Sequence, residues 1–265
     1  VHDLAIYEHP AWFPSGQDFS TKVLVPKSIA KAEKIIAVSE STKKSIIKRF
    51  HVPEKKIQVI YEAFEGEPKV SKRAQELVKE KYGIKDKFFF YIGTLEPRKN
   101  LEAMVAAFDG LLHKDYKKYK NWQFIIAGAK GWKYEKLFEA IRKAKSGHIR
   151  HIGYVPHKEK MALLAAADFF VFPSLWEGFG LPVLEAMGLG TPVLTSKISS
   201  LPEIVGKAAL LIDPRKITAV KKGLVQMLSK PALRRFLAKK GKTQSGRFSW
   251  ARTAKQTIKI YESVV

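Results

Sequence analysis

Short apolar runs alternate with helical patterns along the middle of the chain. The runs are bounded by Gly or Pro and lie at Phe88–Ile92, Gln123–Ala127, Phe169–Phe172 and Pro192–Thr195. Segments with apolar residues at helical spacing lie between them, at Leu101–Leu112, Tyr134–Ala144 and Lys158–Ala167. Strands that alternate with helices of this length predict βαβ units and a parallel sheet covered by helices on both faces. The predicted fold class is therefore α/β.

The start of the chain predicts one further βαβ unit. We expect strands at Lys34–Val38 and Ile57–Ile60, with Ser39 as the N-cap of a helix over Glu40–Phe50. Acidic residues, Gly and Pro interrupt the pattern at Ala63–Lys69, where we place a domain boundary. The piece before it has only about 62 residues, which is small for a complete α/β domain. The chain after it is long enough for a whole one.

Composition narrows the class of protein. Hydrophobic residues make up 46% of the 265 residues, which is ordinary for a chain that buries a core and excludes global disorder. Cysteine is absent, which excludes disulfides, thiolate nucleophiles and Cys-ligated metal sites. No apolar run reaches the ~18 residues needed to span a bilayer. The opening VHDLAIYEHP lacks the basic-then-apolar order of a signal peptide.

Positive charge is concentrated toward the end of the chain. There are 48 Lys and Arg against 25 Asp and Glu, and Pro214–Tyr261 holds 14 of the basic residues and no acidic one. Such a block is either a solvated helical face or a docking face for an anionic membrane, a phosphorylated carrier or nucleic acid. Apolar residues recur at helical spacing within it, so we expect the last helix to pack on the protein through Trp250, Ala254, Ile258 and Tyr261.

The segment Phe172–Met187, FPSLWEGFGLPVLEAM, carries the strongest chemical signal. A strand ends at Phe172, a loop with Gly178 and Gly180 follows, and Pro182 suits the first turn of a helix. The glycines allow a ligand to approach the backbone, and the helix start offers free N–H groups. The segment therefore predicts an anion-binding loop.

Two carboxylates, Glu177 and Glu185, bracket this loop. Carboxylates beside an anion site suit a ligand that also offers hydroxyl groups, as a sugar or a ribose does. The spacing alone leaves an ordinary glycine turn with two solvated glutamates equally open.

The motif EGFGLPVLE at Glu177–Glu185 resembles the E-x₇-E motif of the retaining, nucleotide-sugar-dependent glycosyltransferases of family 4, which have the GT-B fold. Other landmarks of that family have counterparts in the same order: the opening VHD, Ile36–Ser41 (IAVSES), Tyr91–Asn100 (YIGTLEPRKN), Phe124–Gly128 (FIIAG), His151–Val155 (HIGYV) and Thr191–Pro192. The resemblance covers nearly the whole chain. It implies a partial N-terminal, acceptor-side domain at 1–65, a complete Rossmann-like donor domain at 66–249 and a C-terminal helix at 250–265 that crosses back.

The resemblance also implies roles for individual residues. Arg98 and Lys99 would bind the donor diphosphate, where negative charge builds up as the bond to the sugar breaks. Glu177 and His2 would face the donor sugar. The other implied donor-site residues are Glu185 at the ribose, Tyr154 and Val155 at the base, and Gly93, Gly178, Phe179, Gly180 and Leu181 around the sugar and phosphates. No metal or other cofactor is implied, and His9 fits packing better than catalysis.

The implied activity is transfer of a hexose, with mannose favoured, from a GDP- or UDP-sugar to a hydroxyl group of a glycan or a lipid-linked acceptor. The diphosphate of the donor would act as the base. The family's Gly-rich loop on the first N-terminal strand has no counterpart here, and the first residue is Val1. We therefore expect that about half of a domain of ordinary size is missing. Exposed strand edges would then favour a homo-oligomer or a partner chain, with little activity of the isolated chain.

Two alternatives from other classes stay open. One is a non-catalytic nucleotide-sugar-binding half that needs another chain. The other, less favoured, is a basic nucleic-acid-binding α/β protein. A cytoplasmic protein that binds the inner face of the membrane fits the basic block and the unremarkable N-terminus.

Overall fold

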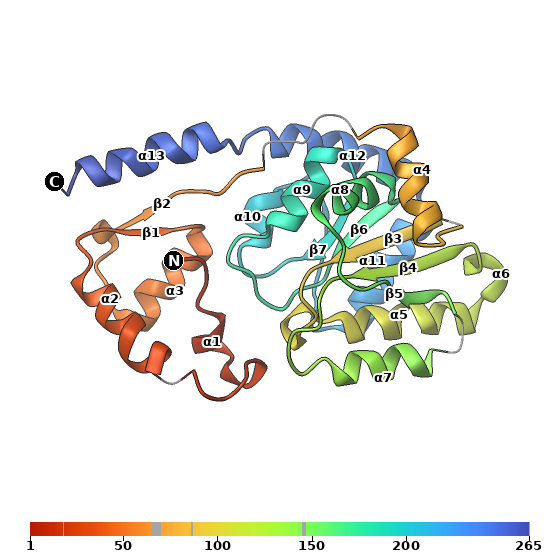
Figure 1. The fold of residues 1–265 in the computed structure, drawn as a ribbon, viewed down its shortest axis with the longest axis horizontal. Helices are drawn as coiled ribbons and strands as arrows, with labels where there is room; N and C mark the ends of the chain where they lie inside the picture. The colour runs from red at the N-terminus through yellow and green to blue at the C-terminus, as the bar shows by residue number, and fades with distance from the viewer. Residues whose placement is uncertain (18, 65–69, 86, 145–146, 265) are drawn as a thin grey trace.

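Two parallel sheets organise the chain, as the computed structural model shows (Figure 1). The structure describes residues 1–17, 19–64, 70–85, 87–144 and 147–264, so most of the expected boundary at Ala63–Lys69 lies outside the described residues. The larger sheet has the strand order β5-β4-β3-β6-β7-β8. Its strands are β3 (Lys87–Ile92), β4 (Trp122–Ala127), β5 (Ile149–His151), β6 (Phe169–Phe172), β7 (Val193–Ser196) and β8 (Leu210–Ile212).

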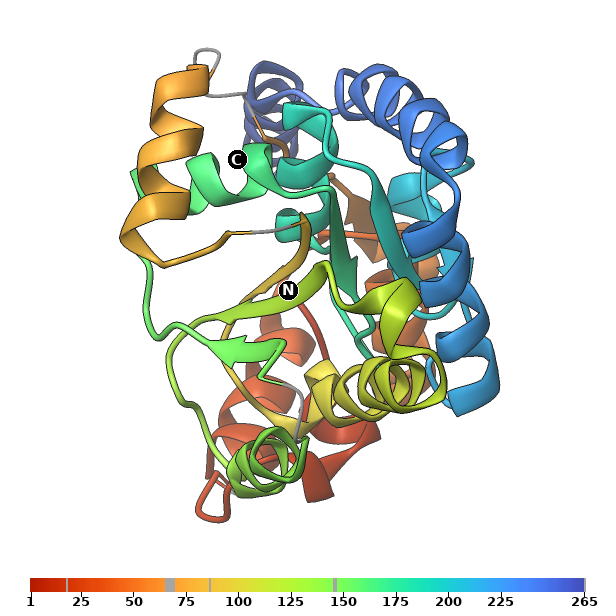
Figure 2. The ribbon, with the colours of Figure 1, turned by 90° about the vertical axis from the view of Figure 1, so that its right-hand side faces the viewer.

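Helices cover both faces of this sheet (Figure 2). On one face α5 (Leu101–Lys114) contacts both α7 (Glu135–Lys143) and α11 (Ile217–Ser229). The other face carries a row of contacting helices: α4 (Lys72–Lys81), α8 (His157–Ala166), α9 (Leu181–Leu189) and α12 (Pro231–Ser245). The short helices α6 (Tyr116–Tyr119) and α10 (Leu201–Val205) lie between these elements in the chain. The predicted α/β class is confirmed.

Aromatic packing holds the central strands together. The ring of Phe89 in β3 stacks on Phe124 of β4 at 4.5 Å and on Phe169 of β6 at 5.0 Å between centroids. All three side chains are fully buried. Aromatic pairs at this spacing add stability beyond the area they bury. They fix β6 against β3, which matters for the site described below.

The smaller sheet pairs β1 (Ile35–Ala37) with β2 (Ile57–Val59) in parallel through the crossover helix α3 (Glu40–Phe50). The hydroxyl of Ser39 accepts a hydrogen bond from the Thr42 amide at 3.0 Å, so the predicted N-cap and βαβ unit are confirmed. Five short elements around this unit had not been predicted: α1 (Ala5–Glu8), η1 (Pro10–Trp12), η2 (Ser20–Leu24), α2 (Val25–Lys31) and η3 (Glu54–Lys56).

The last helix, α13 (Trp250–Glu262), follows α12 in the chain and runs over β2 (Figure 1). The Thr253 hydroxyl donates to the carbonyl of Tyr61 at 2.6 Å. The prediction that Trp250, Ala254, Ile258 and Tyr261 pack inward was wrong, because those side chains are exposed. The half-buried face is lined instead by Thr253, Thr257 and Ile260, and on this face the Thr253 hydroxyl contacts the Tyr61 backbone.

Candidate functional site

The candidate site lies where the strand order reverses, at the carboxyl ends of β3 and β6. From β3 the chain builds outward to β4 and β5, and it returns to the other side of β3 with β6. The chain therefore continues from β3 toward one side of the sheet and from β6 toward the other. Open α/β sheets bind ligands at the place where the strand order reverses in this way. The first loop includes η4 (Pro97–Lys99), and the second includes the EGFG segment.

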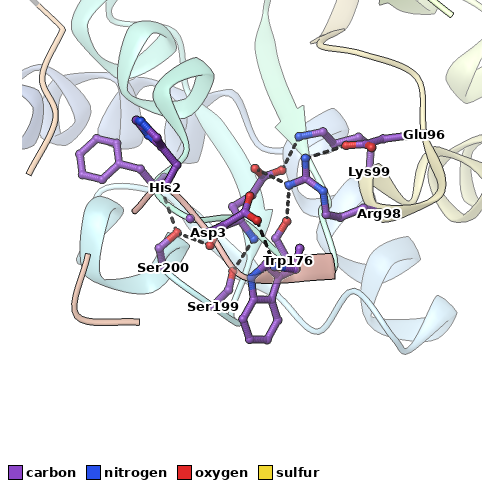
Figure 3. A network of polar contacts seen from close by, with 12 residues as sticks. His2, Asp3, Glu96, Arg98, Lys99, Trp176, Ser199 and Ser200 are labelled. Carbon is purple, nitrogen blue, oxygen red and sulfur yellow. Dashed lines mark hydrogen bonds and ion pairs between the residues drawn. The ribbon is translucent and has the colours of Figure 1, made fainter. Parts of the chain in front are cut away.

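A network of buried ion pairs joins the two loops (Figure 3). The Lys99 Nζ lies 2.7 Å from Glu177 Oε1, and the Arg98 Nη1 lies 2.9 Å from Glu177 Oε2. The other guanidinium nitrogen, Nη2, lies 2.6 Å from Glu96 Oε1. Two cations and two carboxylates thus balance. The sequence reasoning missed Glu96, although it stands two residues before Arg98 in the same quoted motif.

Mutual charge keeps these buried groups ionised. Burial acts to raise the pKa of the Glu177 carboxyl, but Lys99 and Arg98 outweigh it and hold that pKa below the ordinary 4.5. Burial acts to lower the pKa of Arg98, and the charges of Glu177 and Glu96 more than offset it. Arg98 and Lys99, the cations predicted to bind diphosphate, are therefore charged, and both are already paired with the Glu177 carboxylate.

Two serines hold the backbone of the EGFG loop. Neither was among the site residues predicted from the sequence. The Glu177 amide donates to the Ser199 hydroxyl at 3.1 Å. The Ser200 hydroxyl is placed to donate to the carbonyls of Glu177, at 2.9 Å, and Phe179, at 3.1 Å. The signal available in the sequence was the pair of small polar residues in SSLPE, just before a helix.

The other side of the EGFG loop touches the first residues of the chain. A Cβ atom added at Gly178 would lie 1.9 Å from the carbonyl oxygen of His2, so only glycine fits there. The Thr42 hydroxyl in α3 donates to the same His2 carbonyl at 3.1 Å. The His2 side chain itself is 84% exposed, with Nδ1 3.1 Å from Glu62 Oε1. The backbone of His2 is thus fixed while its ring stays accessible.

Glu185 lies on α9, away from the ion network. Its Oε1 pairs with the Lys160 Nζ of α8 at 2.7 Å. Its other carboxylate oxygen, Oε2, is buried and has no hydrogen-bond partner among the described residues. A buried, unpaired carboxylate oxygen is costly, and an added donor would relieve that cost.

The other residues singled out in the sequence surround these groups. Gly180 has a φ of +107° and immediately precedes Leu181, the first residue of α9. Gly93 follows β3 with a φ of +154°. Tyr154 is 73% exposed whereas Val155 is buried, so the two point to different surroundings.

Histidines play no part in a metal cluster. His9 stacks on Trp12 with ring centroids 3.9 Å apart and meets the edge of Trp176 at 5.8 Å, which is a packing role. Within the described ranges, no three His, Asp or Glu side chains are grouped so that they could hold a metal ion.

Comparison with known proteins defines the family. Residues 72–244 match the model of the glycosyl transferases group 1. The chain is 34% identical over 264 residues to the O-antigen chain mannosyltransferase B of Escherichia coli, an alignment that covers 98% of this chain and 68% of that protein. It is 32% identical over 236 residues to the serotype-specific mannosyltransferase WbdA of Escherichia coli, covering 86% of this chain but 28% of the larger protein.

Solved structures agree on the fold. The sucrose-phosphate synthase of Thermosynechococcus elongatus superposes with a TM-score of 0.78 at 22% identity, covering 99% of this chain and 66% of that one. HepE of Anabaena, in a complex with UDP and glucose, superposes with a TM-score of 0.85 at 19% identity, covering 99% and 70%. The chain belongs to the group 1 family of glycosyl transferases, as its motifs predicted, and it has the α/β architecture of GT-B enzymes over about two thirds of their length.

Proposed function

We propose that this chain binds the donor in a retaining glycosyltransferase that moves mannose from a nucleotide diphosphate sugar to a hydroxyl acceptor. The observation that carries the proposal is the Arg98–Lys99 pair at the carboxyl edge of the sheet, beside the EGFG loop. Mannosyltransferases are among the relatives, which supports mannose as the sugar. UDP and glucose in the HepE complex support a nucleotide-linked hexose as the ligand class.

The chemistry follows from the charges of the site. As the bond between sugar and diphosphate breaks, negative charge grows on the diphosphate, and Arg98 and Lys99 stabilise it with preorganised positive charge. The liberated phosphate oxygen accepts the proton of the attacking acceptor hydroxyl on the same face of the sugar, so the configuration is retained. Glu177, at the centre of the pair, keeps both cations oriented before the donor arrives.

Glu185 is expected to hold the ribose through its unpaired Oε2 oxygen. Replacing it in Glu185→Gln removes a charged acceptor, which contributes about 1.5–3 kcal/mol to a hydrogen bond. Calorimetry with UDP and GDP should therefore show nucleotide binding weakened by about tenfold or more. Glu139→Gln is the matched control, since Glu139 lies on α7, is exposed and pairs with Lys143. Unchanged affinity for both nucleotides would remove Glu185 from the site.

Binding and transfer should separate in the isolated chain. The proposed donor residues lie almost wholly in the larger domain, whereas transfer also needs an opposing domain that places the acceptor and excludes water. A thermal-shift screen of UDP, GDP and their sugars tests the binding half of the proposal, because a ligand that binds only the folded state raises its melting temperature. Rapid sugar transfer by a monomer without any added chain would contradict the separation.

We further propose that the end of the chain adsorbs to anionic lipid. None of the helices in the described part of the chain is long and apolar enough to cross a membrane. On α13, however, Trp250, Ile258 and Tyr261 are exposed among basic residues that include Lys255 and Lys259. An exposed apolar stripe flanked by cations suits the interface of a charged bilayer.

Vesicle flotation tests this surface. At about 1 kcal/mol per basic residue near such a membrane, Lys255→Glu/Lys259→Glu should release most of the protein from vesicles that contain anionic lipid. The same pair of changes at Lys114 and Lys143, outside the basic block, should leave flotation unchanged. Equal flotation on neutral and anionic vesicles at low salt would show that the block is only a solvated face.

A further inference from the structure

The segment that leads from β7 into α10 contacts the EGFG loop on one side and helix α3, beside the smaller sheet, on the other. Ser199 has a φ of +54°, a left-handed conformation that is uncommon for a residue with a side chain. It and Ser200 hold the backbone of the EGFG loop, as described above. Four residues on, Glu203 in α10 reaches the smaller domain: its Oε2 accepts from the Glu40 amide at 3.1 Å and its Oε1 from the Ser41 amide at 3.3 Å.

These amides are the first two of α3, and neither has a partner within its own helix. A carboxylate at that position makes charge-assisted hydrogen bonds and also meets the positive end of the helix dipole. Burial and the nearby Glu40 side chain raise the pKa of Glu203, and the two amide donors act against this rise. The two amide donors thus match the two oxygens of the Glu203 carboxylate, across 163 and 162 residues of sequence.

The helix α3 in turn carries Thr42, whose hydroxyl holds the carbonyl of His2. One continuous set of contacts therefore runs from the EGFG loop, through Ser199, Ser200 and Glu203, to the start of α3 and on to His2. The loop is held from two sides by a segment of its own domain and by a segment of the other.

We propose that Glu203 is a positioning residue that couples the donor loop to the smaller domain, so that an occupied donor loop fixes the position of α3 and His2. This inference rests on the proposed function for the identity of the ligand. Without the Glu203 contact, the larger domain still binds its nucleotide, but the smaller domain is held by fewer contacts, among them that of Thr253 with the Tyr61 carbonyl and the ring contact of His9 with Trp176.

The absence of cysteine makes distance measurement by paired spin labels straightforward. Labels at Lys55→Cys, beside β2, and Lys143→Cys, at the end of α7, report the separation of the two domains from exposed sites. In Glu203→Ala we expect the ratio of closed to open molecules to fall by about tenfold or more, because hydrogen bonds to a charged group contribute at least that much. Addition of UDP or GDP should narrow the distribution of distances between the two labels in the parent chain and not in this variant.

A second variant removes the contact from the other side. Glu40 is the first residue of α3, where proline is well tolerated and lacks only the N–H that Glu203 accepts. Glu40→Pro removes one of the two amide donors and leaves that of Ser41, so it should open the molecule in part, less than Glu203→Ala does, whereas Glu40→Ala, which keeps both N–H groups, should not. The proposed coupling would be overturned if Glu203→Ala and Glu40→Pro gave the same distributions of label distances as the parent chain, both with and without nucleotide.

The proposed function has a separate readout. If neither UDP nor GDP binds any variant, the donor assignment fails, yet the nucleotide-free distances still decide whether Glu203 holds the two domains together. If nucleotide narrows the label distances in the parent alone and binds the variants more weakly, the coupling is supported independently of sugar transfer, because two coupled sites affect each other by the same factor.

Discussion

The Glu177→Gln variant is expected to be less stable than the parent chain by about 3 kcal/mol. Its carboxylate is the partner of both Arg98 and Lys99, and all three side chains are largely buried. Removing one partner of a buried ion pair leaves an uncompensated charge, which costs about 3–5 kcal/mol. The amide of glutamine keeps some hydrogen bonding, so we expect the lower end of this range. Urea denaturation at neutral pH measures the difference, with the exposed Glu139→Gln as the control.

The same loss of stability should depend on pH. The folded pKa of Glu177 lies below its ordinary value of 4.5, so its ionised form stabilises the fold above 4.5. That contribution disappears as the pH falls through the lowered folded pKa. The parent and Glu177→Gln should therefore converge in stability as the solution is acidified below 4.5. A constant difference at all pH values would show that the ion pairs do not cause it.

Glu177→Gln should also bind nucleoside diphosphates more tightly than the parent chain. The variant keeps Arg98 and Lys99 but removes a negative charge that competes with the diphosphate for them. Stability and affinity would then move in opposite directions, which a folding defect alone does not produce. Weaker binding of both UDP and GDP would contradict this prediction and would mean that the orientation of the two cations by Glu177 outweighs its competition with the diphosphate.

Replacing both cations should have the largest effect on binding. In Arg98→Ala/Lys99→Ala, two charge-assisted contacts to the diphosphate are lost, each worth about 1.5–3 kcal/mol, or roughly a hundredfold or more in affinity together. The nucleoside, which lacks the phosphates, should lose little. Because salt screens charge interactions, the difference between the two ligands should shrink as salt is added.

The double variant also leaves the Glu177 carboxylate without its two cationic partners, which destabilises the fold. The effect of the variant on binding must therefore be separated from this loss of stability. The triple variant, Arg98→Ala/Lys99→Ala/Glu177→Gln, leaves no unpaired charge at Glu177 and provides that control. Calorimetry should find the diphosphate bound as weakly by the triple as by the double variant. Equal losses for nucleoside and diphosphate would show that the pair acts through folding.

Much of the fold was readable from local sequence. The strand Phe169–Phe172 and the helix Glu40–Phe50 have the predicted bounds, because an apolar run and a Ser39 cap define them without help from distant residues. The short β5 and β8, at three residues each, had not been predicted, since their burial depends on neighbouring strands. The face of α13 that turns toward the protein was also predicted wrongly, because its contacts, such as that of Thr253 with the Tyr61 carbonyl, are made with residues far away in the sequence.

The residues of the candidate site likewise divide into those that the sequence indicated and those that it did not. Arg98, Lys99 and Glu177 could be proposed from the sequence because they lie in segments that resemble motifs of the family, and the structure brings the three side chains together. Lys160 and Glu203 were not proposed, since they lie outside the segments for which a resemblance was noted. The pairing of Lys160 with Glu185 follows from the packing of α8 on α9, which periodicity does not predict.

The reversal of strand order has a consequence for how the chain is made. Lys99 and Glu177 are 78 residues apart, so at about 5–20 residues per second the ribosome delivers the carboxylate roughly 4–16 s after the cation. Until then β3 has no partner on the side that β6 will occupy, and its aromatic edge is open to other chains. A nascent chain stalled in this interval exposes an apolar edge beside Lys99, whose carboxylate partner Glu177 has not yet been made, so the chain is then prone to aggregate through that edge.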